Sequence, residues 1–357
     1  MLIPFLRFCG KIYLVAASFL AFLFLLGYEH QFVLFLSNVR LFILLPAITI
    51  GFFLILRSPC SRWTFLTFIG ALGLPYFLFL EPEYCAGDNI STDQEIHVMT
   101  LNLAGSSDVP GRNLNDFIKN NEIDVLSLQE VTPNFWKTEG KSLKAILPYE
   151  AYRASPEGYW TQALLSRYPI ESTRVLDPGP GFSNFDSRLV LEVSLMLHGM
   201  PFSIQALHLS VPFYRGPCRG LHCLLVRYDQ SQRDRQLEKS IAWSQTKDHP
   251  TILLGDLNLS DQNPEYERLY KDSIDAGRCS DDNPATWPAD NTVPVAFTRI
   301  DYALIMNRKS VPILANSRTF RIQGTDHMAL VARFLIPEPW TRARPIKATR
   351  ARPVEIN

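Results

Sequence analysis

Apolar residues dominate the first part of the chain, which contains three long stretches without a charged residue. Such stretches approach the ~17 to 25 apolar residues with which a helix crosses a bilayer. The pattern predicts an α-helical transmembrane region over residues 1–90, with three membrane-spanning helices at about 11–28, 39–57 and 63–80. The middle helix is the least regular of the three, because Pro46 and Gly51 lie within it.

Two interpretations of the first apolar stretch compete. Arg7 and Lys11 precede it, as basic residues precede the apolar part of a secretory signal. The two further apolar stretches favour a multi-pass protein that keeps its anchor. Positive loop residues lie on the cytoplasmic side of a membrane, which assigns Arg7, Lys11, Arg57 and Arg62 to that side. Three crossings would then carry the rest of the chain to the periplasmic or extracellular side.

From residue 91 to 337 the apolar residues form short runs rich in β-branched and aromatic side chains, which are typical of strands. The expected strands are 96–103, 125–129, 163–165, 189–197, 202–209, 251–255, 299–305 and 328–334. Amphipathic helices are expected at 112–120 and 231–247. Strands outnumber helices, so the pattern favours an α/β sandwich. The basic segment 338–357 has no apolar period and is expected to be a disordered tail.

Polar residues recur where the expected strands end. Asp256 and Asn258 stand two apart after an apolar strand, and alternate residues of a strand point to the same side. Other strand-like runs deliver similar groups: Asn102, Glu130, His208, Asp301, and the adjacent pair Asp326 and His327. Taken singly, each also fits a structural role, such as a strand-end cap, a solvated carboxylate or a buried histidine. Their joint occurrence indicates a shared site.

In this order along residues 96–335, the motifs resemble those of the endonuclease/exonuclease/phosphatase family, which includes DNase I, exonuclease III, neutral sphingomyelinases and inositol polyphosphate 5-phosphatases. The resemblance implies a DNase I-like fold of two packed β-sheets flanked by helices. It also implies metal-dependent hydrolysis of phosphoric esters.

The resemblance assigns roles to the strand-end residues. Glu130 is the expected metal ligand, with Asn102 and Asp326 beside it, and an all-oxygen set suits Mg²⁺ or Mn²⁺. Asp256 would orient or deprotonate the attacking water, and Asn258 would donate a hydrogen bond to the phosphate.

Two histidines complete the expected constellation. Asp301 would fix the tautomer of His327, which would stabilise the phosphate in the transition state. His208 resembles a second histidine that faces the phosphate in the DNase I and sphingomyelinase branches. Arg188 precedes a strand and is a weaker candidate for phosphate contact, since a surface salt bridge explains it equally well.

Cysteine usage and charge limit the environment and the partners. Cys85, Cys218, Cys223 and Cys279 lie beyond the apolar stretches, and their even number permits pairing in an oxidising compartment. Cys218 and Cys223 are the favoured pair, with free thiols as the alternative. The net charge of zero excludes a global basic field for nonspecific nucleic-acid binding, and nothing indicates a protein partner.

These observations predict a membrane-anchored, metal-dependent phosphodiester hydrolase with an extracytoplasmic catalytic domain at 91–337. A nuclease-type activity is the first interpretation. A hydrolase of lipid phosphodiesters, similar to phospholipase C or sphingomyelinase, is the alternative, because the same residues address only the phosphate. A membrane-tethered binding module without catalysis is a third, and the presence of all the acidic and imidazole groups argues against it.

Overall fold

The computed structural model describes residues 2–26, 31–38, 40–55, 62, 95–106, 109, 111–153, 161–176, 190–197, 199–212, 228–280, 283–289, 295–306 and 314–335. Several expectations fall outside these residues. They are the third membrane helix at 63–80, the tail at 338–357, Arg188, and the pair Cys218 and Cys223.

The N-terminal region contains the helices α1 (Leu2–Leu25), α2 (Gln31–Ser37) and α3 (Arg40–Ile55). Small and apolar side chains join α1 to α3 in one cluster: Leu14, Ala17, Ala21, Leu44 and Ala47. Within the described residues, one helix is long and apolar enough to cross a bilayer, over Pro4–Phe24. The apolar part of α3, Phe42–Gly51, is shorter than a span. The structure therefore supports one of the three expected spans, and only by its length and composition.

The first helix also differs from its expected bounds, because it begins at Leu2 and not near residue 11. Arg7 and Lys11 lie within it with exposed side chains. Long basic side chains can cover apolar surface with their stems while the charge stays in water, so they need not end an apolar helix.

Residues 95–335 form two packed β-sheets of six strands each. The first sheet has the order β11-β12-β1-β2-β4-β3. Its strands are β1 (Glu95–Asn102), β2 (Val125–Val131), β3 (Tyr149–Arg153), β4 (Thr161–Ser166), β11 (Leu314–Arg321) and β12 (Met328–Leu335). The second has the order β5-β6-β7-β8-β10-β9. Its strands are β5 (Ile170–Leu176), β6 (Val190–Leu197), β7 (Met200–His208), β8 (Thr251–Asp256), β9 (Ser273–Asp275) and β10 (Asp301–Met306).

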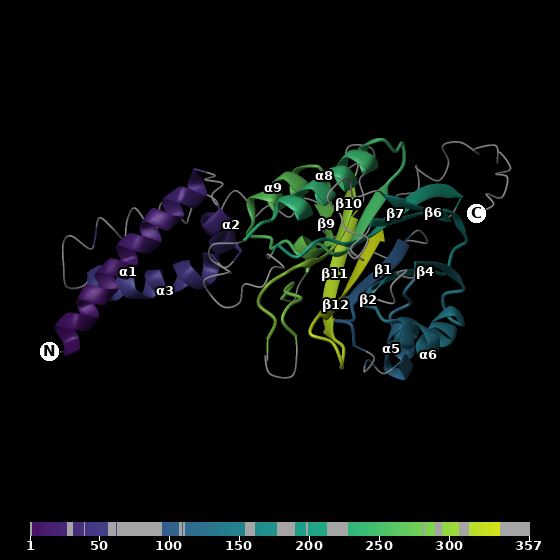
Figure 1. Ribbon diagram of the computed structural model, residues 1–357, viewed down its shortest axis with the longest axis horizontal. Helices are drawn as coiled ribbons and strands as arrows, with labels where there is room; N and C mark the ends of the chain where they lie inside the picture. Colours follow the sequence, from purple (N-terminus) through teal and green to yellow (C-terminus); the bar gives the residue numbers. More distant parts are fainter. Residues whose placement is uncertain are drawn as a thin grey trace.

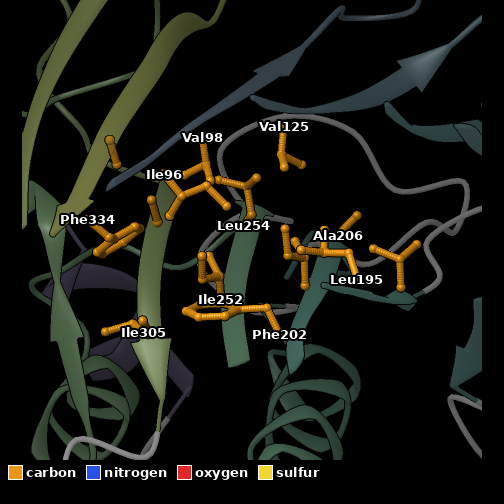
Figure 2. Packing of buried hydrophobic residues seen from close by; sticks show 14 of the residues in the cluster. Ile96, Val98, Val125, Leu195, Phe202, Ala206, Ile252, Leu254, Ile305 and Phe334 are labelled. Carbon is orange, nitrogen blue, oxygen red and sulfur yellow. The ribbon is translucent and has the colours of Figure 1, made fainter. Parts of the chain in front are cut away.

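Alternation along the strands creates the core between the sheets. Ile96 and Val98 of β1 face Ile252 and Leu254 of β8, and Phe334 of β12 lies in the same fully buried cluster (Figure 2). On the opposite face, Met99 and Leu101 of β1 and Leu253 of β8 are buried under helices. Apolar side chains on both faces explain why the central parts of these strands show no alternation of apolar and polar residues.

Helices cover both outer faces (Figure 1). The first sheet carries α5 (Gly111–Asn120) and α6 (Pro133–Lys144), and the second carries α8 (Ser231–Gln245) and α9 (Pro264–Lys271). A short 3₁₀ helix, η1 (Ala276–Cys279), follows β9. The expected sandwich flanked by helices is confirmed, as are all eight expected strands and both expected helices. The elements β3, β5, β9, β11, α6 and α9 were not expected.

The junction between α2 and α3 contacts the sandwich beside α9 (Figure 1). Asn38 Nδ2 donates to the Tyr228 hydroxyl at 2.9 Å, and Asn263 Nδ2 donates to Asn38 Oδ1 at 3.3 Å. The rings of Phe42 and Phe297 meet edge to face with centroids 5.1 Å apart. The helical region is therefore attached through side-chain contacts as well as through the chain.

Candidate active site

Three adjacent strands of the second sheet align the polar residues His208, Asp256 and Asp301. His208 ends β7 and pairs with Asp256 at the end of β8, and Asp256 pairs with Asp301 at the start of β10. Gly255 allows this arrangement: its φ is +149°, and a Cβ there would lie 2.0 Å from the Leu207 carbonyl oxygen. Glycine is thus required where β7 and β8 carry their catalytic candidates.

The first sheet contributes Asn102 at the end of β1, Glu130 in β2, and His327 just before β12. Asn102 Nδ2 donates to Asp256 Oδ2 at 3.0 Å, which joins the two sheets at the site. The Thr325 hydroxyl donates to the Asn102 carbonyl oxygen at 2.7 Å and accepts from the His327 N–H at 3.1 Å. Thr325 therefore fixes the backbone on either side of the site.

Strained backbone gathers around these residues. Of the four non-glycine residues with positive φ in the described part of the chain, Ala104 (+53°), Glu130 (+54°) and Asn258 (+47°) lie at the site. Such conformations cost roughly 1 to 3 kcal/mol each and persist only where the surroundings enforce them. At Glu130 the cause is an irregularity between Leu128 and Val131 in the pairing of β2 with β4. This bulge redirects the Glu130 carboxylate.

The pair Asp301 and His327 is buried and directly hydrogen-bonded, with 2.9 Å between Asp301 Oδ2 and His327 Nδ1. Burial alone would lower the pKa of His327, but the charge and hydrogen bond of Asp301, with Asp256 and Asp326 nearby, raise it to about 9. The N–H of Asp301 donates to the Thr286 hydroxyl at 3.1 Å. Asp301 thus holds the imidazole as expected, and Thr286 holds Asp301.

At the other buried groups of the site, the pKa shifts disfavour the charged form. Burial and the neighbouring Asp301 raise the pKa of Asp256 to about 7, against the opposing effects of His327 and two hydrogen bonds. Burial also raises the pKa of Glu130. Burial and His327 lower the pKa of His208 to about 3. His208 Nε2 lies 3.5 Å from Glu130 Oε1 and 4.0 Å from Asp256 Oδ2.

The donor set fits a divalent cation. Three buried polar atoms of the site make no hydrogen bond: His208 Nε2, Asp301 Oδ1 and Asp326 Oδ1. Buried carboxylates with raised pKa values are stabilised by a bound positive charge, which a hard cation supplies through oxygen ligands. One candidate group is Asp256, Asp301 and His327, whose ligand atoms lie within 4.8 Å of one another.

The expected ligands Glu130, Asn102 and Asp326 form a second candidate group. Glu130 is close enough to both others for them to act on its pKa: Asn102 lowers it and Asp326 raises it, within a net rise that burial causes. Asp326 is partly exposed: its Oδ2 accepts from Trp287 Nε1 at 3.1 Å, and its Oδ1 lies 3.9 Å from His327 Nε2. A cation held by Glu130, Asn102 and Asp326 would leave the hydrogen bond between Asp301 and His327 intact. A cation held by the first group would compete with that bond.

Asn258 lies at the site, and some of its hydrogen-bonding groups are already used within the protein. Its N–H donates to Asp256 Oδ1 at 2.8 Å, and its Nδ2 donates to the Leu209 carbonyl oxygen at 2.9 Å. One amide hydrogen remains for a phosphate oxygen. Beside the site, a cleft of about 480 Å³ opens along Ala104, Ala289, Arg321, Gln323, Thr325 and Asp326.

Sequence reasoning missed the roles of Gly255, Thr286 and Thr325. The glycine before Asp256 was the one available signal, because glycine within a strand marks close backbone approach. The hydroxyl contacts join residues far apart in the chain and leave no local pattern.

The comparisons agree with this geometry. Residues 99–327 match the family model described as "Endonuclease/Exonuclease/phosphatase family", which covers well over half of the chain. The chain belongs to this family. It is a metal-dependent phosphoric ester hydrolase of the phosphodiesterase and nuclease type. A search of the curated proteins found no match.

Solved structures show the same fold at low identity. An endonuclease/exonuclease/phosphatase protein from Bacteroides vulgatus is 14% identical with a TM-score of 0.53, covering 69% of this chain and 100% of its own. Truncated Caenorhabditis elegans TDP2 is 20% identical with a TM-score of 0.51, covering 68% and 98%. D. rerio TDP2 complexed with single strand DNA product is 15% identical with a TM-score of 0.50, covering 68% and 99%.

Proposed function

We propose that this protein is a membrane-anchored phosphodiesterase that uses Mg²⁺ or Mn²⁺ at the junction of its two sheets. The observation that carries the proposal is the buried constellation in which Asn102 contacts Asp256 across the sheets while Asp301 holds His327. A structural role would not require so many ionisable groups to be buried together, because each costs free energy unless it is paired.

Glu130, Asn102 and Asp326 would hold the cation, which supplies positive charge to the phosphate and leaving oxygens. Asp256 is fixed at both oxygens, by Asn102 and by the Asn258 N–H, and in that position it orients and deprotonates the attacking water. Asn258 donates its remaining amide hydrogen to the phosphate. This division leaves the carboxylates to act on water and metal.

The histidines address the charge that develops on the phosphate. His327 carries a positive charge at neutral pH because Asp301 accepts its Nδ1–H, so Nε2–H points away from that carboxylate. Such a preorganised donor stabilises the transition state more than the ground state. His208 lies beside Glu130 and Asp256 and faces the same phosphate as a neutral imidazole.

Two features support an extracytoplasmic, membrane-anchored enzyme. α1 presents an almost unbroken apolar surface, on which Phe5, Phe8 and Phe19 are each 62% exposed. Cys279 is disulfide-bonded, and disulfides persist in oxidising compartments outside the cytoplasm. A cleaved signal sequence has the same composition as α1. The packing of α1 on α3, and the contacts of residues 38 and 42 with the sandwich, favour a retained anchor.

Nuclease-type activity is the first candidate, since D. rerio TDP2 has this fold and its structure holds a single strand DNA product. Hydrolysis of lipid phosphodiesters is the second candidate. The exposed side chains of Trp287, Val295 and Phe297, in the segment before Asp301, favour it, together with the contact of Phe297 with Phe42 of α3. A binding module without catalysis conflicts with the intact constellation.

A substrate panel tests the proposal on the full chain in detergent micelles. Bis(p-nitrophenyl) phosphate, single-stranded DNA, RNA and phospholipid micelles are offered with Mg²⁺, with Mn²⁺ and with EDTA. We expect metal-dependent cleavage of at least one phosphodiester, and a loss of ~10² to 10⁴ in kcat for Asp256→Asn. Cleavage that survives both EDTA and Asp256→Asn would show that the site is wrongly assigned. Alkaline extraction of membranes tests the anchor separately.

A further inference from the structure

Exposed large apolar side chains are concentrated at one place on the sandwich. In the part of residues 95–335 that the structure describes, four such side chains are exposed: Tyr149, Trp287, Val295 and Phe297. The last three lie in the segment that precedes Asp301, and their exposed fractions are 37%, 61% and 43%. Together we call Trp287, Val295 and Phe297 the apolar lip. Single exposed apolar residues are ordinary, but a cluster at a functional site marks an interaction surface.

The apolar lip is tied to the active site. Trp287 Nε1 donates to Asp326 Oδ2 at 3.1 Å, and Asp326 precedes His327. The Phe297 N–H donates to the Trp287 carbonyl oxygen at 3.2 Å, and backbone hydrogen bonds join Trp287 to Thr298 in both directions at 2.9 Å. Trp287 and Phe297 thus lie on paired backbone, and Trp287 contacts the partly exposed Asp326.

The same lip continues the apolar surface of the helical region. The ring of Phe297 meets that of Phe42 at the start of α3, with an interplanar angle of 76°. Further along α3, Leu45 is 56% exposed and Phe53 is 64% exposed. The lip is therefore in contact with α3, a helix that exposes further apolar side chains to the surroundings.

We propose that the apolar lip inserts into the surface of the bilayer that holds the helical region, and that it presents the active site to phosphodiester groups of membrane lipids. The inference rests on the proposed function, since it needs both the membrane anchor and the phosphodiesterase site. Base stacking is the competing use of exposed aromatic rings beside such a site. Val295 has no aromatic ring on which a base could stack. The ring of Phe297 is already in contact with Phe42. A lipid surface therefore fits the lip better.

Kinetics with the full chain reconstituted in vesicles test the proposal. The vesicles contain phosphatidylcholine, phosphatidylglycerol and sphingomyelin, and soluble bis(p-nitrophenyl) phosphate and single-stranded DNA serve as the other substrates. Val295→Ser and Phe297→Ser remove apolar surface from the lip. The matched control is Tyr149→Ser, which removes an aromatic side chain that is 41% exposed on β3.

We expect each lip variant to lower the rate of lipid cleavage by about tenfold, through weaker engagement of the surface, and to leave cleavage of the soluble probe unchanged. The control should change neither rate. Lipid cleavage equal to wild type in both lip variants would overturn the proposal, as would a wild type that cleaves the soluble probe and none of the three lipids. Loss confined to single-stranded DNA would assign the lip to base stacking instead.

Fluorescence provides a readout that does not depend on activity. Brominated phosphatidylcholine quenches tryptophan within the bilayer, and the difference between wild type and Trp287→Phe isolates the Trp287 signal. Quenching of that difference signal is expected, and its absence would place the lip in water and overturn the proposal. Failure to cleave any phosphodiester would overturn the proposed function, while the quenching result would still decide whether the lip contacts lipid.

Discussion

The two sheets build their halves of the active site in different ways. The second sheet supplies His208, Asp256 and Asp301 through strand register, so neighbouring strands bring them side by side. The first sheet supplies Glu130 from a bulge with φ of +54°, and Asn102 is held by Ala104, whose φ is +53°. Regular pairing fixes the groups that act on water and on the histidine. Distorted backbone fixes Glu130 and Asn102, two of the groups proposed to hold the metal. On the side of the second sheet, Asn258 after β8 is the one non-glycine residue of the site with a positive φ.

The difference shows where free energy is stored. A register position follows from hydrogen bonds that the sheet makes anyway, whereas a left-handed residue is held against its preference. Relieving the strain in the part of the site built by the first sheet should therefore stabilise the protein and lower its activity. Disturbing the strand register in the part built by the second sheet should destabilise the protein. The following predictions test this contrast.

Removal of the metal should have the largest effect. EDTA is expected to abolish hydrolysis, and Mg²⁺ or Mn²⁺ to restore it, because without the cation the phosphate faces the buried carboxylates with His327 as its one charged partner in the proposed constellation. Glu130→Gln should raise the metal concentration needed for half-maximal rescue. Glu139→Gln, on α6, is the control. Full activity of the wild type in EDTA would contradict the metal assignment.

The Asp301–His327 pair gives the next largest effect. Because Asp301 acts through His327, the loss caused by Asp301→Asn should largely disappear in a His327→Ala background. Turnover of bis(p-nitrophenyl) phosphate by the two single variants and the double variant measures this coupling. If the two losses multiply, Asp301 has a role of its own, for example as a ligand in the group with Asp256.

The geometry of the regular half of the site was the part that the sequence could predict. Alternation in apolar strands placed Asp256, His208 and Asp301 at strand ends, and the resemblance supplied the fold that brings them together. Polar, exposed strands escaped notice: β5 has four consecutive exposed residues, so it carries no hydrophobic period. The helices α6 and α9 escaped although Thr132 and Asn263 cap them and proline follows each cap.

The backbone distortions of the other half could not be predicted from the chain, although Asn102 and Glu130 were both candidates at strand ends. Nothing around Glu130 signals a bulge, since the bulge results from the pairing of β2 with β4. The hydrogen bond from Trp287 to Asp326 joins residues 39 apart in sequence. The contact of Phe42 with Phe297 likewise depends on how the helical region meets the sandwich. Membrane topology remains a prediction for the same reason, because hydrophobicity alone does not separate a span from a signal sequence.

Disturbing the register at Gly255 should destabilise the protein strongly. In Gly255→Ala the added Cβ would meet the Leu207 carbonyl oxygen at 2.0 Å, so β7 and β8 must separate. We expect a loss of roughly 3 kcal/mol or more in the free energy of unfolding, as for other severe backbone clashes. Gly199→Ala is the matched control: its φ is +81° but nothing lies within 4 Å of the added atom. It should cost about 1 kcal/mol, the price of a left-handed alanine alone. Equal losses in chemical denaturation would show that the strand contact is not tight.

Relieving the strain at Ala104 should have the smallest effect on stability, and we expect stability and activity to change in opposite directions. Glycine adopts a positive φ without penalty, so Ala104→Gly is expected to raise the free energy of unfolding by up to about 1 kcal/mol. The same change should lower activity, because the Ala104 N–H holds Asn102 Oδ1 at 2.8 Å and a freer loop positions that amide less well. Glu122→Gly is the control, since Glu122 has φ of +51° in the turn that precedes β2 and contributes no group to the site. It should gain similar stability with unchanged activity. If Ala104→Gly gained stability and kept full activity, the strain in the first half of the site would serve the fold and not the chemistry.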